Sequence, residues 1–347
     1  MKKNLFIGAT LLFALIITGC PKSTEEPVQS EEVSVSDVKG SGAENSVKEL
    51  KDDGKTGEDI GGLFAGAFET QMSNEETQTA LMNSIQPFLN IFDPKGETEI
   101  LNSRAVIVDE LKNEYLKLLE ESENFQKNLQ KDGKAVFDYS ISPNGISYED
   151  DVISIDISKL NISTNEVTYS VNVDDESEII SEDLKGEAKV DAAAKGKVDF
   201  TNVKGLEDFV IREGILQVAL NGNAAIDEVY DRKEEESSVS GNLNAGLTAS
   251  SVITVIIPDA DKKYGGKILS KASVKFDCDK IENLNEPPTE ELGKYLTINI
   301  TSDLYTDNGE KVCELLKITT FEELLKLISS EGGSSEGDSF EGDSFEE

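Results

Sequence analysis

The stretch that decides the fold is Leu184–Phe200, which reads LKGEAKVDAAAKGKVDF. Small or apolar residues alternate with mostly charged residues along this stretch. A period of two is typical of a β-strand with one buried face and one wet face. Ala, Gly and Val dominate the apolar face. The sequence therefore predicts a long strand whose apolar face either lets a covering element approach closely or leaves a groove.

The same pattern continues on both sides of this stretch. Alternating segments occupy residues 137–141, 153–157, 167–173, 214–229, 239–257, 268–278 and 296–305. Because such segments follow one another with polar turns between them, we expect a curved antiparallel meander of about eight to ten strands. Leu184–Phe200 would be roughly 55 Å long as one strand. A strand of that length must bend, and glycines such as Gly186 and Gly196 offer bending points.

The residues before the alternating zone follow a helical spacing. Apolar residues recur at steps of three and four over 81–92, and at steps of three, four and seven over 101–129. A last short helix is predicted over 320–329, where a Thr-Thr pair precedes two glutamates. We therefore expect one α+β domain over residues 57–330, with helices over 57–131 and the sheet over 135–318. The N-terminal helices are expected to pack on the apolar face of the sheet.

The first twenty residues have a different character. Two lysines precede a nearly unbroken apolar run, Leu5 to Ile17, which is too short for a stable bilayer span of about 20 residues. This is the layout of a secretory signal peptide. The run ends in Ile17-Thr18-Gly19-Cys20. These four positions resemble the lipobox of bacterial lipoproteins, in which an aliphatic residue, a small residue and Gly or Ala precede the lipid-accepting Cys.

The lipobox resemblance covers these residues alone. It implies that residues 1–19 are a lipoprotein signal peptide, that cleavage falls between Gly19 and Cys20, and that acyl chains are attached to Cys20. Each buried CH₂ contributes about 0.8 kcal/mol, so several chains make such an anchor effectively permanent. Pro21 is not the aspartate associated with inner-membrane retention, which favours an outer membrane or the cell surface if the cell has two membranes. The resemblance thus implies an exported protein whose partner is the membrane.

Both flanks of the expected domain are acidic. Residues 20–56 are rich in Ser, Glu, Lys and Asp, and their apolar residues are isolated, so we expect a disordered tether after the acylated cysteine. Residues 331–347 contain no base and repeat the sequence EGDSF. This composition predicts a disordered acidic tail.

Composition excludes several classes of function. The chain has 69 acidic and 33 basic residues, a net charge of −36, whereas nucleic-acid binding needs clustered Lys and Arg. It has no histidine, which excludes Ser-His-Asp and Cys-His nucleophile systems and imidazole-ligated zinc. The acidic clusters lack the ligand spacing of a calcium loop. We therefore expect no catalytic residues, no metal site, no cofactor and no enzymatic activity.

Two further features are candidates for a role. Cys278 and Cys313 are the cysteines left after acylation of Cys20, and an exported chain permits either a disulfide or two buried free thiols. The segment 61–68 is apolar, small and flexible. Its side chains Leu63, Phe64 and Phe68 are candidates for membrane contact, and tight packing on the sheet is the alternative.

Three hypotheses of function follow from these features. The leading one is a non-enzymatic binding or structural module of the cell envelope, held to the membrane through Cys20. The alternative is a carrier of an apolar ligand, a lipid or an acyl chain, between the helices and the small-residue face of the sheet. A hydrolase that works without histidine is the third. The sequence names neither the ligand nor an envelope protein that would be its partner.

Overall fold

The structure is a computed structural model, and it describes part of the chain. The described residues are 32–89, 117, 120, 123–125, 127–128, 134–137, 140–141, 146–173, 179–231, 236–280 and 293–329. The predicted signal peptide, the cleavage and acylation site at Gly19 and Cys20, most of the predicted helix over 97–130, and the acidic tail lie outside them.

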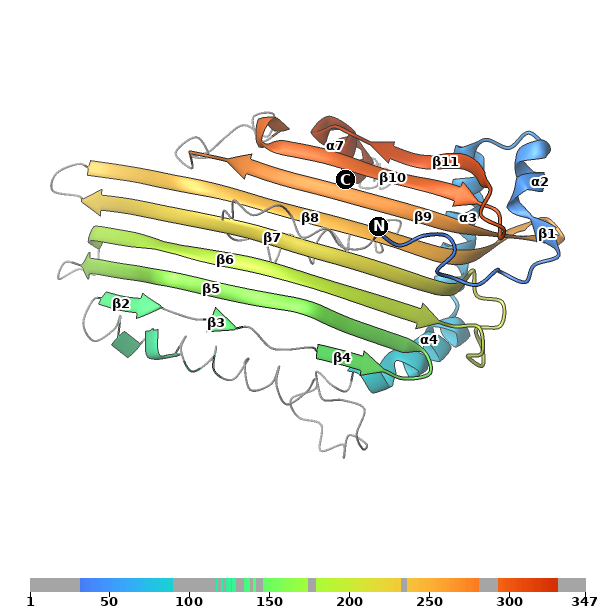
Figure 1. Cartoon of the computed structure of the whole chain (residues 1–347), viewed down its shortest axis with the longest axis horizontal. Coiled ribbons are helices and arrows are strands. Elements are labelled where there is room, and N and C mark those ends of the chain that lie inside the picture. The colour runs from blue at the N-terminus through green and yellow to red at the C-terminus, as the bar shows by residue number, and fades with distance from the viewer. Residues whose placement is uncertain are drawn as a thin grey trace, which may run out of the picture.

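A mostly antiparallel open sheet dominates the described part of the chain (Figure 1). Its strands are β1 (Asn45–Ser46), β2 (Lys134–Phe137), β3 (Ser140–Ile141), β4 (Ile146–Glu149), β5 (Ile153–Val173), β6 (Ile179–Asp199), β7 (Ile211–Asp231), β8 (Glu236–Asp259), β9 (Lys262–Cys278), β10 (Leu296–Tyr305) and β11 (Lys311–Ile318). The strand order is β11-β10-β9-β8-β7-β6-β5-β2, with β3 and β4 on β5 and β1 parallel to β9. The predicted antiparallel meander is thereby confirmed, although the sheet has eleven strands and not the eight to ten predicted.

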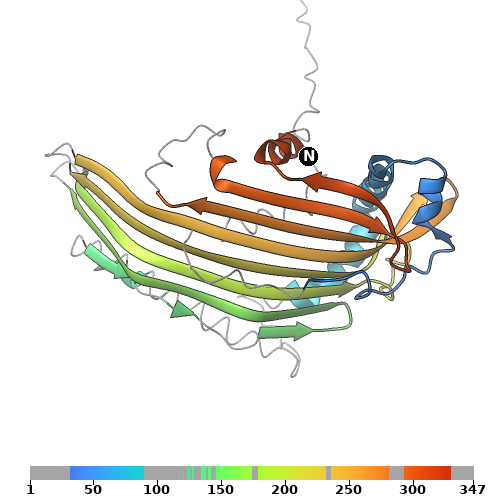
Figure 2. The same ribbon diagram turned by 45° about the horizontal axis from the view of Figure 1, so that its top comes forward.

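The strands β5 to β8 are unusually long. Each of β5, β6 and β7 has 21 residues and β8 has 24, which corresponds to roughly 70–80 Å of extended chain. They bend along their length, as Figure 2 shows. Directly paired residues lie on the same face of the sheet, so the register divides the residues into an apolar face, such as Ala194 beside Val218, and a polar face, such as Lys195 beside Gln217. A slip of one residue would move the charged set onto the apolar face.

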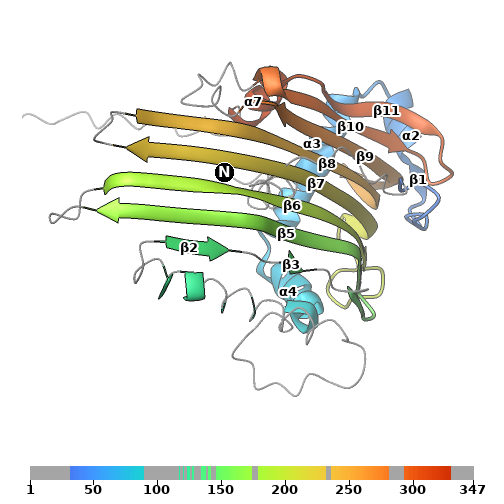
Figure 3. The same cartoon turned by 60° about the vertical axis from the view of Figure 1, so that its left-hand side comes forward.

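Helices are a minor part of the described structure. They are α2 (Val47–Asp52), α3 (Gly57–Met72), α4 (Glu75–Leu89), the 3₁₀ turn η3 (Gly293–Tyr295) and α7 (Phe321–Ser329). Capping boxes start two of them, Ser46 with Glu49 in α2 and Thr56 with Asp59 in α3. The predicted last helix is confirmed as α7. Figure 3 shows α3 and α4 together on one side of the sheet.

The core lies at the end of the sheet that α3 covers. There Ile60 of α3 and Leu50 of α2 are fully buried against Val255, Ile257 and other apolar-face residues. A second cluster, formed by the turn between β6 and β7, receives the aromatic side of α3. Burial of one such large side chain stabilises the fold by roughly 1.5–3 kcal/mol. Farther along the apolar face, α7 covers Ile298 and Ile300.

The prediction of a disordered tether over 20–56 is wrong for residues 32–56. These residues are ordered and include β1 and α2. The isolated apolar residues that show no periodicity are each buried separately: Val33 and Val38 are 3% and 4% exposed, and Val47 is fully buried. Sequence periodicity cannot reveal a segment that inserts single side chains into a surface made by other elements.

Candidate functional site

The apolar face carries a band of small side chains that crosses the strands, here named the apolar strip. Two adjacent cross-strand rows form it: Gly196, Leu216, Ser251 and Ser270, and Ala194, Val218, Ala249 and Ala272. It runs from β6 to β9, which is three strand spacings or about 14 Å. The strip therefore lies in the part of the sheet that the sequence marks as small and apolar.

The apolar strip is most open at Leu216, whereas Val218 packs against the neighbouring cluster of Leu220 and Leu247, and Ala272 packs against the cluster under α7. Leu216 is 37% exposed, the largest value of any large apolar residue in the described long strands β5 to β9, and the other members of the strip are half-buried. A Cβ placed on Gly196 would meet a single atom, the Ser154 carbonyl oxygen at 4.0 Å. Toward one end of the sheet, Ile253 and Ile268 pack with the helices. Toward the other end, Leu220 and Leu247 form a buried cluster.

The chemistry of the apolar strip is uniform. None of its residues is charged, because the lysines and acids next to these two rows, such as Lys195, Lys197 and Lys271, occupy the polar face. Its polar groups are the hydroxyls of Ser251 and Ser270, and the Ser270 hydroxyl is 2.9 Å from that of Ser302. Such a surface offers dispersion contacts to an apolar ligand and nothing that selects a charged one.

The polar face is crossed by an ordered segment, residues 32–46, here named the N-terminal arm (Figure 1). Lys267 of β9 holds the arm on the sheet, since its Nζ donates hydrogen bonds to the carbonyl oxygens of Val35 at 2.7 Å and Val38 at 2.9 Å. The Lys267 side chain is buried, with 5% of the residue exposed. Because a buried cation is costly without partners, these two bonds fix the path of the arm.

A buried carboxylate holds the next part of the arm. Glu213 is 2% exposed, and it accepts a hydrogen bond from the Lys39 amide at 2.7 Å and lies 2.7 Å from Lys197 Nζ. Lys39 Nζ lies 3.1 Å from Asp199. Burial raises the pKa of Asp199, but hydrogen bonds from Thr201 and the pairing with Lys39 outweigh it and leave the pKa below its ordinary value. The arm is thus clamped by paired charges on both sides.

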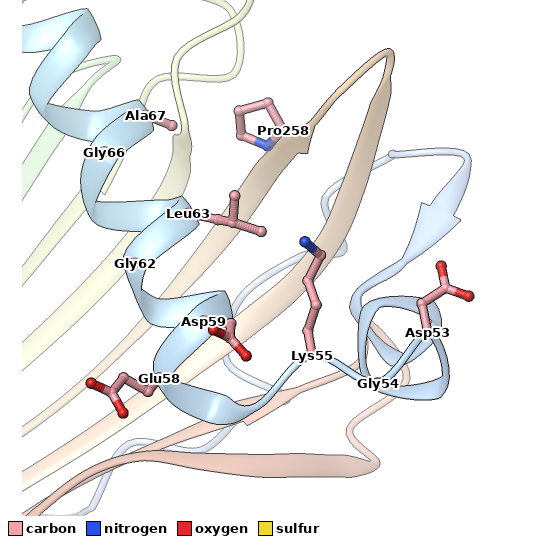
Figure 4. A pocket seen from close by; sticks show the side chains of 10 residues that line it. All are labelled: Asp53, Gly54, Lys55, Glu58, Asp59, Gly62, Leu63, Gly66, Ala67 and Pro258. Carbon is pink, nitrogen blue, oxygen red and sulfur yellow. The ribbon is translucent and has the colours of Figure 1, made fainter.

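A separate open hollow of about 900 Å³ lies beside the start of α3 (Figure 4). Gly62, Leu63, Gly66 and Ala67 of α3 and Pro258 form its apolar wall, and Asp53, Gly54, Lys55, Glu58 and Asp59 form its charged rim. The charged groups do not converge: Lys55 pairs with Asp259 at 3.1 Å, and Asp59 caps α3. The carboxylates of Asp53 and Glu58 point away from each other (Figure 4). The hollow therefore gathers no set of groups that would act together.

The predicted membrane-contact residues are partly buried and pack against the core. Leu63 and Phe64 contact the main core cluster, and Phe64 and Phe68 contact the cluster between β6 and β7. The Phe68 ring stacks on Phe64 and lies 6.1 Å from the ring of Phe209, measured between centroids. The structure therefore supports the packing alternative for these three side chains.

Of the two alternatives left open for Cys278 and Cys313, the structure has the free thiols and not the disulfide. Cys313 lies opposite Leu304, which lies opposite Ile268, and Cys278 is ten residues farther along the same strand as Ile268. Ten strand residues cover roughly 33 Å, whereas a disulfide needs Cα atoms within about 7 Å. Cys278 is fully buried, and burial raises the pKa of the half-buried Cys313 thiol.

Comparison with protein-family models, with curated proteins and with solved structures finds no match. Within the residues that the structure describes, no helix has both the length and the apolarity that crossing a membrane requires. No group of three or more Cys, Asp or Glu side chains is arranged there to hold a metal ion.

Proposed function

We propose that this chain is an exported lipoprotein, acylated at Cys20, whose sheet binds an acyl chain on the apolar strip. The proposal adopts the finer description of the fold, an α+β domain in which N-terminal helices cover part of a curved sheet. It makes the protein a non-catalytic binding module held to a membrane, with an outer membrane or the cell surface as its location. The lipobox resemblance supports the anchor.

The observation that carries ligand binding is the exposure of Leu216 in the middle of an uncharged apolar surface. An exposed apolar patch with packed clusters on both sides is typical of an interaction site. An acyl chain fits its dimensions, because each leaflet of a hydrocarbon core about 30 Å thick gives a chain length of about 15 Å, and the strip is about 14 Å long. The absence of charge within the strip favours a hydrocarbon chain over a polar ligand.

Fluorescent fatty-acid titration tests the proposal. Mature chain with Cys20→Ser, which has no acyl chains of its own, is titrated with a polyene fatty acid that fluoresces when it leaves water. Leu216→Glu should weaken binding by roughly tenfold or more, since a carboxylate in the strip must be desolvated beside the ligand. The matched control is Gln217→Glu, which places the same charge one residue away on the opposite face.

The titration gives different results if the strip binds the acyl chain and if it does not. Saturable binding that Leu216→Glu removes and Gln217→Glu keeps supports the acyl-chain site. If the parent chain gives no saturable signal, or if both variants weaken binding equally, the strip is not the site. Circular dichroism of both variants checks that the fold is retained. The intact mass of protein extracted from membranes tests the anchor independently, because acylation at Cys20 adds the mass of the chains to a protein that begins at that residue.

A further inference from the structure

The N-terminal arm begins over the middle of the polar face, not at an edge of the sheet. The Val33 amide donates to the Ser250 hydroxyl at 3.3 Å, and Glu32 pairs with Lys271. Ser250 and Lys271 are direct neighbours on β8 and β9, near the centre of the strand order. The described chain therefore begins, on the side that leads back to Cys20, at the centre of one face.

This starting point is fixed by burial. Val33 and Val38 insert into a small apolar cluster with Ile215 and Val252, whose side chains are 7% and 0% exposed. The Thr254 hydroxyl donates to the Lys39 carbonyl at 2.7 Å and holds the next turn of the arm. With the contacts of Lys267 and Glu213, these interactions give residues 33–39 a single path across the sheet.

The length of the chain before the arm limits how the sheet can face a membrane. Cys20 and Glu32 are twelve residues apart. Twelve residues of chain span at most roughly 40 Å when fully extended. To bring the apolar face to the bilayer, the chain would have to pass two strand spacings to the β11 edge, about 10 Å, and then the thickness of the sheet and the helical layer, about 20 Å more. The polar face needs no such detour.

The charge of the polar face suits an approach to lipid headgroups. Over residues 185–199, 213–227, 240–254 and 267–277, the polar-face positions hold seven lysines and six acidic residues, and the N-terminal arm that crosses them adds Lys39, Glu32, Asp37 and Glu44, so this surface has a net charge of −1. The whole chain has a net charge of −36. Exposed Lys189 and Lys195 lie on this face. An anionic bilayer repels this surface less than the average surface of the protein.

We propose that the polar face of the sheet, on the side where the N-terminal arm crosses it, is the surface that the protein presents to the bilayer. The apolar strip and helices α3 and α4 then face away from the membrane, into the surrounding solution. This inference rests on the proposed acylation of Cys20 and does not depend on acyl-chain binding by the strip. It also agrees with the packing of Phe64 and Phe68 against the core.

Energy transfer to the membrane surface tests this orientation. Acylated protein is reconstituted in phosphatidylcholine vesicles that contain a small fraction of headgroup-labelled acceptor lipid. Donor dyes are attached to Lys195→Cys on the polar face or to Leu216→Cys on the apolar face, both in a Cys278→Ala, Cys313→Ala background. The two positions are neighbours in register, since Lys195 pairs with Gln217, so they differ mainly in the face that they occupy. Higher transfer efficiency from position 195 is expected.

Two results would overturn the orientation. One is equal or higher transfer from position 216. The other is failure of the acylated protein to float with the vesicles in a density gradient, which removes the anchor and the orientation with it. The first result leaves the anchor intact, so the two failures are distinguishable.

If the cysteine-free background does not fold, lysine footprinting replaces the dyes. The unmodified acylated protein is treated with a water-soluble acylating reagent, with and without vesicles. Reactivity of Lys189 and Lys195 should be lost on vesicles, whereas Lys48, which is outside the sheet faces and 49% exposed, should react as before. Unchanged reactivity at Lys189 and Lys195 contradicts the proposal.

Discussion

Replacement of Lys267 by Met is the sharpest test of how the N-terminal arm is held. Met keeps the volume of the buried lysine stem and removes the ammonium that bonds the carbonyls of Val35 and Val38. Hydrogen bonds to charged groups contribute roughly 1.5–3 kcal/mol each. The buried ammonium also has a desolvation cost that Met does not have, which offsets part of the loss. We expect a net loss of about 2–4 kcal/mol of arm docking.

Hydrogen exchange followed by mass spectrometry measures this loss directly. Because each 1.4 kcal/mol is a factor of ten, exchange of the amides in the arm should become roughly 30- to 800-fold faster. The strands β6 to β8 should keep their protection, since the arm is not part of their ladder. Local opening of this kind is expected for a segment held by a few buried contacts.

The matched control is Lys263→Met. Lys263 is 54% exposed and pairs with Asp208, which is 80% exposed, so the pair contributes about 0–1 kcal/mol. If Lys267→Met leaves exchange in the arm no faster than Lys263→Met does, the reasoning that the buried ammonium fixes the arm is refuted.

Gly266→Ala should lower the free energy of unfolding, measured by urea denaturation, by about 1–3 kcal/mol. The new Cβ would lie 2.6 Å from Val47 Cγ2 and 2.7 Å from the Tyr305 carbonyl oxygen. Gly62→Ala, with no atom within 4 Å, should raise that free energy by up to about 1 kcal/mol, and changes of the same sign contradict the packing described. The intact mass without reductant should be that of a chain with free thiols at Cys278 and Cys313, and both thiols should be alkylated slowly. A mass lower by two hydrogens would indicate a disulfide and contradict the strand register. Amide hydrogen exchange in the arm should become faster in acid. The pKa of Asp199 is lowered in the folded protein, so its contribution to arm docking is complete above pH 3.8 and is lost as the pH falls through the folded pKa. Exchange in residues 33–41 that is unchanged below pH 3.8 would contradict the role of Asp199 in holding the arm.

The long strands could be predicted from the sequence because they have one polar, solvent-facing side and one apolar side. Alternation of that kind appears directly in the residues, and β6 and β8 are found where the alternation is longest. The antiparallel order also follows for strands joined by short connections, such as β7 to β8 and β8 to β9, because a short connection places consecutive strands side by side. The division between polar and apolar positions, and therefore the uncharged nature of the apolar strip, was readable in the same way.

The arm could not be predicted from its own residues. Val33 and Val38 stand among polar residues and show no period. A signal existed elsewhere: Ile215, Val252 and Leu269 form one cross-strand row on the polar face, where alternation predicts wet residues. Three large apolar residues in register on a wet face indicate that another segment covers them. Pairing between strands was needed to see this row, and single-strand patterns do not supply it.

The sequence left open whether Cys278 and Cys313 are bonded, for a related reason. Two cysteines in an exported chain suggest a bond, but strand register decides whether the thiols can meet. The openness of Leu216 also depends on which elements cover the sheet, and no local pattern encodes that.

The path of the arm has a mechanical consequence. A load applied at Glu32 meets four contacts in sequence: the Val33 amide on Ser250, Lys267 on the Val35 carbonyl, the Lys39 amide on Glu213, and the Ser41 amide, which donates to Asp307. They would peel in succession at low force, and the ladder between the long strands would bear no tension until the segment had been stripped as far as Val47. The arm thus acts as a series of weak links that yields before the sheet does.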